Sequence, residues 1–168
     1  MKIKDIMTRN AKSCTPETSV REAAEIMREA DCGALPVVQK GRTLGMITDR
    51  DICLALAERN RLPSDLQVEE AMSRALYACA KEDGVEKALA TMRGKQVRRL
   101  PVVDGNGALR GIVSLNDVAL HAVEKGDGRA IPYKEAMKTL KAICGHRHAA
   151  PLTTKGQPAA RAQSRVQP

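Results

Sequence analysis

The chain has 168 residues and a formal net charge of +8, with no Phe, no Trp and two Tyr. This length suits one compact domain or two small interlocked ones, and the core must be aliphatic. Aromatic platforms for stacking single-stranded nucleic acid are therefore excluded as a basis of function.

No apolar run approaches the roughly 18 residues that a membrane span needs. The first ten residues, MKIKDIMTRN, lack the apolar stretch of a secretory signal. The five cysteines contain no CxxC pair, which favours reduced thiols over a disulfide framework. We therefore expect a cytoplasmic protein without a membrane contact.

The positive charge is concentrated near the C-terminus. Residues 1–124 hold 19 Lys and Arg against 18 Asp and Glu, whereas residues 125–168 hold 9 against 2. The first part of the chain is thus nearly neutral, and an acidic or nucleic-acid partner would meet the basic tail.

The sequence repeats itself along its first three quarters. LPVV at 35–38 recurs 65 residues later at 100–103, and GMITDRD at 45–51 recurs as GIVSLND at 111–117 after 66 residues. The extra residue falls in a Gly-bearing turn, where an insertion costs little. We define unit 1 as residues 1–62 and unit 2 as residues 63–126.

Each unit is expected to run strand, helix, strand, strand, helix. Ser19 and Glu22 predict a capping box at the first helix, and the two β-rich runs of each unit surround a Gly turn typical of a hairpin. In chain order the pattern predicts a helix over 18–32, strands over 34–38 and 43–48, a helix over 49–60, a helix over 83–95, strands over 100–103 and 111–114, and a helix over 115–126.

Residues 127–145 form a C-terminal extension with one more predicted helix, Tyr133 to Cys144. Its apolar residues at near-helical spacing are Ala136, Met137, Leu140 and Ile143, with lysines on the other face, so it could dock on the units or on a partner. Residues 146–168 are rich in Pro, Ala, Gln and Arg, which predicts a disordered basic tail.

A hydroxyl and a carboxylate stand three residues apart at the same strand-to-helix junction in both units, as Thr48 with Asp51 and as Ser114 with Asp117. One interpretation is a helix cap close to a capping box. The other is ligand contact, because a carboxylate accepts two O–H bonds from a cis-diol and a hydroxyl can donate to a phosphate. The two interpretations are compatible if the hydroxyl caps its helix while donating outward.

The motifs DIMT, TPETSV, LPVV and GMITDRD, repeated in tandem, resemble a pair of cystathionine-β-synthase (CBS) domains, the so-called Bateman module. The resemblance covers roughly residues 1–124. It implies an α/β (α+β) fold of two tandem CBS units, each a small β-sheet with two packed helices, that together form one pseudo-twofold module. Modules of this family usually bind adenosine-containing molecules between the two sheets and often pair into flat homodimeric discs.

The resemblance also implies roles for individual residues. Asp51 and Asp117 would bind the ribose, and Thr48 and Ser114 a phosphate. The residues just before PVV would line the base pocket. Together with their apolar walls, the base-pocket residues are Ala34, Leu35, Val37, Ile47, Leu100, Val102 and Val113. The alternative for the apolar side chains is ordinary core.

Three arginines are further phosphate candidates. Arg98 and Arg99 precede the apolar strand of unit 2, and Arg50 lies just inside a helix start. A guanidinium can bind a phosphate with two parallel hydrogen bonds, although a plain position at the protein surface explains the same residues.

Catalysis finds no support in the motifs. The chain contains no Gly-rich phosphate loop, HExxH or nucleophile elbow, so we expect neither an enzyme, nor a metal site, nor a catalytic cofactor. The preferred interpretation is a stand-alone, homodimeric regulatory module that binds AMP, ADP, ATP, S-adenosylmethionine or NAD and signals to another protein in trans. The alternative is a dimeric scaffold that contacts nucleic acid or a partner through its basic tail.

Overall fold

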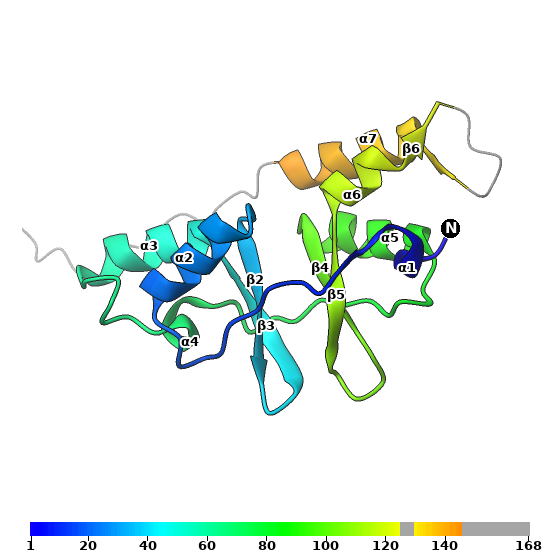
Figure 1. Cartoon of the computed structure of the whole chain (residues 1–168). Coiled ribbons are helices and arrows are strands. Elements are labelled where there is room, and N and C mark those ends of the chain that lie inside the picture. Colours follow the sequence, from blue (N-terminus) through cyan, green and yellow to red (C-terminus); the bar gives the residue numbers. More distant parts are fainter. Residues whose placement is uncertain (125–129, 146–168) are drawn as a thin grey trace, which may run out of the picture.

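The computed structural model describes residues 1–124 and 130–145. Two small sheets stand side by side in the middle of the molecule, and helices cover their outer faces (Figure 1). The elements are α1 Ile3–Ile6, β1 Thr8–Arg9, α2 Val20–Glu29, β2 Ala34–Gln39, β3 Arg42–Thr48, α3 Asp49–Arg59, α4 Val68–Ala71, α5 Val85–Lys95, β4 Arg99–Val103, β5 Leu109–Ser114, α6 Leu115–Leu120, β6 Ala122–Val123, β7 Ile131–Pro132 and α7 Tyr133–Cys144. The predicted fold of two tandem units is confirmed.

The two hairpins have matching registers. In unit 1, Leu35 pairs with Ile47, and in unit 2, Leu100 pairs with Val113. Each register shifts at the same place, after the first valine of PVV, which is Val37 or Val102. The shared bulge is expected from the shared sequence, because a bulge is set by local strand and turn residues.

Each hairpin is extended by a segment from the other unit. Strand β1 of unit 1 pairs with β5, and Ser73 of unit 2 bridges to Met46 of β3. Gly45 permits the second approach, because a Cβ there would overlap the carbonyl oxygen of Ser73. The units are therefore tied together by exchanged edge segments.

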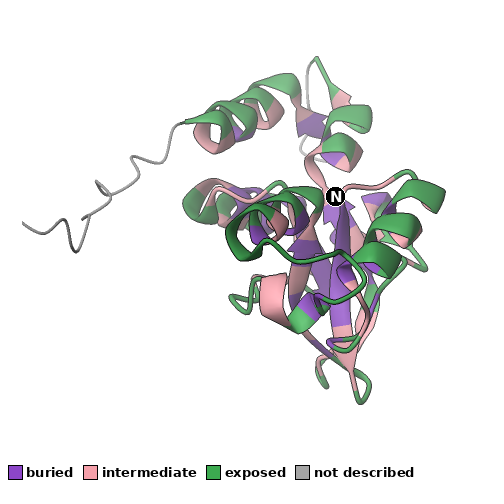
Figure 2. Ribbon diagram, turned by 90° about the vertical axis from the view of Figure 1, so that its left-hand side faces the viewer, coloured by how far each residue is buried: buried purple, intermediate pink, exposed green. Residues whose placement is uncertain are grey.

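The two hydrophobic cores contain the same exchange. Ile3 and Ile6 of α1 lie in the core around Leu89, Leu100 and Val113, although they belong to unit 1 by sequence. Figure 2 shows the buried residues concentrated in the sheets and on the inner faces of the helices. In return, Leu66, Val68 and Met72 lie in the core of unit 1.

The first helix of each unit begins as the sequence indicates, with one difference. The Ser19 hydroxyl accepts a hydrogen bond from the Glu22 N–H at 3.1 Å, which is half of the expected capping box. Its counterpart at the start of α5 is Gly84, which has no side chain to make such a bond.

The C-terminal part of unit 2 departs from the repeat. Helix α6 ends at Leu120, so the expectation of a helix through residue 126 is wrong, and the chain forms the short parallel pair of β6 and β7 instead. Helix α7, whose predicted bounds are confirmed, packs along α5 (Figure 1).

Only half of the predicted apolar stripe of α7 is used in this packing. Ala136 and Ile143 pack against the core of unit 2, whereas the side chains of Met137 and Leu140 are exposed. The buried face is instead completed by Thr139, which is fully buried and accepts a hydrogen bond from Arg93 at 2.9 Å.

The predicted tail, residues 146–168, lies outside the described residues. Among the residues that are described, no helix has the length and apolar character needed to cross a membrane.

Candidate functional site

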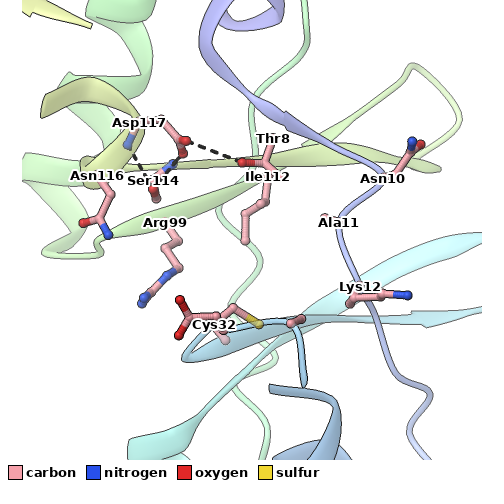
Figure 3. A pocket seen from close by; sticks show the side chains of 13 residues that line it. Thr8, Asn10, Ala11, Lys12, Cys32, Arg99, Ile112, Ser114, Asn116 and Asp117 are labelled. Carbon is pink, nitrogen blue, oxygen red and sulfur yellow. Dashed lines mark hydrogen bonds between the residues drawn. The ribbon is translucent and has the colours of Figure 1, made fainter. Parts of the chain in front are cut away.

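A cleft of about 370 Å³ lies between the two units. Its walls come from the linker that follows β1, from the end of α2, from β2, β4 and β5, and from the start of α6 (Figure 3). The lining residues are Thr8, Asn10, Ala11, Lys12, Ala30, Asp31, Cys32, Ala34, Arg99, Ile112, Ser114, Asn116 and Asp117. Both units contribute to this site.

Ser114 and Asp117 form a reciprocal cap at the start of α6. The Ser114 N–H and hydroxyl both donate to Oδ2 of Asp117, at 2.7 Å each, and the hydroxyl accepts from the Asp117 N–H at 3.2 Å. Among the described residues, the second carboxylate oxygen, Oδ1, has one long contact, of 3.4 Å with the Thr8 hydroxyl (Figure 3). This oxygen is therefore the one that a ligand hydroxyl could reach.

Thr48 and Asp51 have the same geometry at the start of α3. The Thr48 N–H and hydroxyl donate to Oδ2 of Asp51 at 2.9 and 2.7 Å, and the Asp51 N–H returns a bond of 3.1 Å. Neither residue lines the cleft. In both pairs the hydroxyl gives its single proton to the carboxylate. Donation to a phosphate would require that bond to break, so the cap does not leave the hydroxyl free to donate outward.

Of the three predicted phosphate-binding arginines, Arg99 alone lines the cleft. Arg98 is exposed, and its carbonyl accepts a hydrogen bond from the Leu115 N–H at 2.9 Å. Arg50 is exposed on α3 and also lies outside the cleft lining. The second cation of the cleft is Lys12, which lies on the linker and not in a repeated motif.

Six of the seven residues predicted for the base pocket belong to the cores, and only Ala34 lines the cleft. Leu35, Val37, Ile47, Leu100, Val102 and Val113 are each 0% exposed. Side chains alternate across a strand, so the residues one position away, such as Ile112, face the cleft instead. These six side chains therefore lie in the hydrophobic cores and do not line the cleft.

The sequence analysis missed most of the unit 1 side of the cleft. Asn10 and Lys12 come from the linker, and Asp31 and Cys32 come from the turn after α2; both segments are separate in sequence from the unit 2 motif. The residue types at two of these positions were a weak signal in the sequence. In the structure, Asn10 and Asp31 have left-handed backbone conformations, with φ of 54° and 47°. Asn and Asp are the residues that adopt this left-handed conformation most readily, so both mark sharp turns.

The titratable side chains in and around the cleft differ in their surroundings. Among the described residues, no group of three or more His, Cys, Asp or Glu side chains could hold a metal ion. Burial raises the pKa of Cys14 and Cys79 to about 11, so these two thiols are protonated at neutral pH and are poor nucleophiles. The cleft itself offers two cations, two carboxylates and an apolar wall.

The structure is similar to solved CBS domain pairs. The CBS domain pair of protein MJ0100, in complex with 5′-methylthioadenosine and S-adenosyl-L-methionine, superposes with a TM-score of 0.66 at 29% sequence identity, covering 71% of this chain and 98% of that chain.

Curated proteins give the same result. The CBS domain-containing protein YhcV of Bacillus subtilis is 40% identical over 119 residues, which make up 71% of this chain and 84% of that protein. Hypoxic response protein 1 of Mycobacterium tuberculosis is 31% identical over 142 residues, 84% of this chain and 92% of that protein. The CBS domain model matches residues 3–58 and 68–124. With both units matched and both sheets in place, the chain belongs to the CBS domain family.

Proposed function

We propose that the protein is a regulatory module that binds an adenosine-containing ligand in the cleft between its two units. The observation that carries this proposal is that Asp117 lines the cleft and that its Oδ1 is not used by the helix cap. A carboxylate oxygen of this kind can accept hydrogen bonds from ribose hydroxyls.

The rest of the cleft suits the other parts of such a ligand. Ala34 and Ile112 offer apolar surface for a base, and Arg99 and Lys12 offer positive charge for a phosphate or carboxylate group. The 5′-methylthioadenosine and S-adenosyl-L-methionine bound by the MJ0100 pair support the same ligand class. Arg50 and Arg98 are not part of this proposal.

Regulation requires that the ligand bind two states of the module with different affinity. Because the lining comes from both units, ligand binding would favour one relative arrangement of the units over others. We propose that the module works as a homodimer and that a partner protein reads this arrangement in trans. The alternative function through the basic tail depends on residues 146–168, outside the described residues.

The test is calorimetric titration of the full chain with AMP, ADP, ATP, S-adenosylmethionine and NAD, with GTP as the control ligand. We expect saturable binding of at least one adenosine ligand. Asp117→Asn should weaken that binding at least about tenfold, since a hydrogen bond to a charged group contributes about 1.5–3 kcal/mol.

The repeat supplies a matched control. Asp51→Asn removes the same charge from the same cap in unit 1, at a position that does not line the cleft. We expect this variant to lose similar stability but to keep its affinity. Equal weakening by both substitutions would contradict the assignment of the site, and the absence of binding by every adenosine compound would contradict the function.

A further inference from the structure

The repeat builds the main-chain frame of the cleft twice. At the cleft lined by Asp117, β1 pairs with β5, and at the matching place near Asp51, Ser73 bridges to Met46 of β3. Helices α3 and α6 begin with the same reciprocal cap. We call the region around Asp51 and Ser73 the counterpart region.

The turn after the first helix of each unit also has the same backbone. Asp31 and Gln96 have φ of 47° and 52°. The N–H of the next residue, Cys32 or Val97, donates to a carbonyl of the preceding helix at 2.9 or 3.1 Å. The cleft and the counterpart region therefore differ mainly in their side chains.

The side chains of the counterpart region are larger than those of the cleft at two of these positions. Ala11 and Ala30 line the cleft, and a shift of 65 residues replaces them with Leu76 and Lys95. The cleft is thus open at two places where the counterpart region holds longer side chains.

A third position adds an aromatic ring. Lys12 is exposed on the linker (Figure 3), whereas its counterpart Tyr77 is partly buried and packs against the core of unit 2. The ammonium group of Lys95 lies over the Tyr77 ring, 5.1 Å from its centroid, which is within the range of a cation–π contact. The two side chains together place a flat apolar ring, with a cation over it, where the cleft has Lys12 and Ala30.

The turn of the counterpart region is bound to the rest of unit 2. The Gln96 side chain donates hydrogen bonds to the carbonyls of Ala142 and Gly145, at 3.1 Å each, at the end of α7. Val97 packs against the core of unit 2. The matching residues of unit 1, at positions 31 and 32, line the cleft instead.

We infer that the Tyr77 ring, held under Lys95, takes the place of a ligand base in the counterpart region, so that each chain binds one adenosine ligand. The ring is a flat apolar group, as a purine is, and a closely packed site has no room for both. Tyr77 is then the residue that limits binding to the cleft of Asp117. The inference rests on the proposed function, because it concerns how many ligands the module takes and where.

The first test is the stoichiometry of binding to the full chain. Calorimetric titrations with AMP, ATP and S-adenosylmethionine, each used alone, should show one site per chain for those that bind. Two sites per chain would overturn the inference and leave the proposed function standing. No binding of any adenosine compound would overturn both.

The second test removes the ring. Tyr77→Ala combined with Lys95→Ala should add a second site, and a further Asp51→Asn should weaken binding at that site alone. Tyr77→Phe is the matched control, because it keeps the ring and should keep one site. One site in all of these variants would overturn the inference.

The third test transplants the pair, so that the inference stays testable if the Tyr77 variants fail to fold. Lys12→Tyr combined with Ala30→Lys should weaken binding at least about tenfold beyond Lys12→Ala, which removes the same lysine without filling the cleft. Circular dichroism checks the folding of every variant. Equal affinities of these two variants would overturn the inference, because a pair that does not close the cleft cannot close its counterpart.

Discussion

Units 1 and 2 share a local structure but differ in what covers it. Both have the hairpin with its bulge, the reciprocal hydroxyl and carboxylate cap, and a helix before the hairpin. Unit 1 has an 11-residue helix α3 and an open outer groove, whereas unit 2 has a six-residue helix α6 and is covered by α7. Equal local sequence has produced equal local structure, and distant segments have made the two surfaces different.

The two caps make the same point for function. Asp51 and Asp117 hold the same hydrogen bonds, yet only Asp117 lines the cleft. The cleft is completed at Asp117 by the linker and by the end of α2, neither of which belongs to the cap. A motif therefore indicates where a site can be, and its surroundings determine whether it is one.

The largest expected effect comes from the segment that the units exchange. Ile3→Ala should lower the free energy of unfolding by about 2–5 kcal/mol, because Ile3 is fully buried in the core of unit 2. Hydrogen exchange should show that protection falls more in β4, β5 and α5 than in α2. Val68→Ala, which removes the exchanged residue in the core of unit 1, should reverse that pattern. A uniform loss of protection in either variant would contradict two separate cores.

The packing of α7 on α5 of unit 2 predicts a smaller effect on stability. Arg93→Ala should destabilise α7 by about 1–3 kcal/mol, because two hydrogen bonds from the guanidinium to α7 are lost in a partly buried position. The equivalent Arg28→Ala should stay within about 0.5 kcal/mol in the monomer, since Arg28 is exposed. The measurement is urea unfolding at low protein concentration. Equal effects would mean that α7 does not depend on this contact.

The two caps predict equal, moderate effects. Thr48→Ala and Ser114→Ala should each lower the free energy of unfolding by about 1 kcal/mol, because each removes one side-chain cap of the same geometry. Thermal unfolding without ligand measures both. If one variant lost much more than the other, the caps would not be equivalent.

The smallest effect concerns pH and the N-terminal segment. Hydrogen bonds from Lys2 and Lys4 lower the pKa of Glu82 to about 2. Glu82 is more acidic in the folded state, so its contribution is present above the normal pKa of about 4.5 and is lost as the pH falls towards 2. At the matching positions near Glu17 of unit 1, unit 2 contributes Gln67 and Glu69, so Glu17 lacks this pair of cations.

The check is the pH dependence of the melting temperature for wild type and Glu82→Gln between pH 6 and pH 2. The difference between the two proteins should be small, because the pair is exposed to solvent, and it should shrink on acidification and in high salt. A difference that grows at low pH would contradict the assigned pKa shift.

The sequence predicted the fold well because the relevant signals are local. The repeat, the hairpins and the bounds of α7 all follow from patterns of a few to a dozen residues. At the cleft, Ser114, Asp117, Arg99 and Ala34 were predicted from motifs, and the structure brings these four together. For Leu35, Leu100 and Val113, the neighbours Ala34, Arg99 and Ile112 line the cleft, because successive side chains of a strand point to opposite faces.

The sequence by itself determined the two units, their caps and the hydroxyl and carboxylate pairs, since these depend on neighbouring residues. Only the tertiary structure decided that Lys12 and Asp31 line the same cleft as Ser114 and Asp117, that α1 enters the core of unit 2, and that α7 covers α5. Each of these arrangements joins segments far apart along the chain. They are selected by burial of apolar surface and by side-chain direction in the folded state, which no short motif encodes.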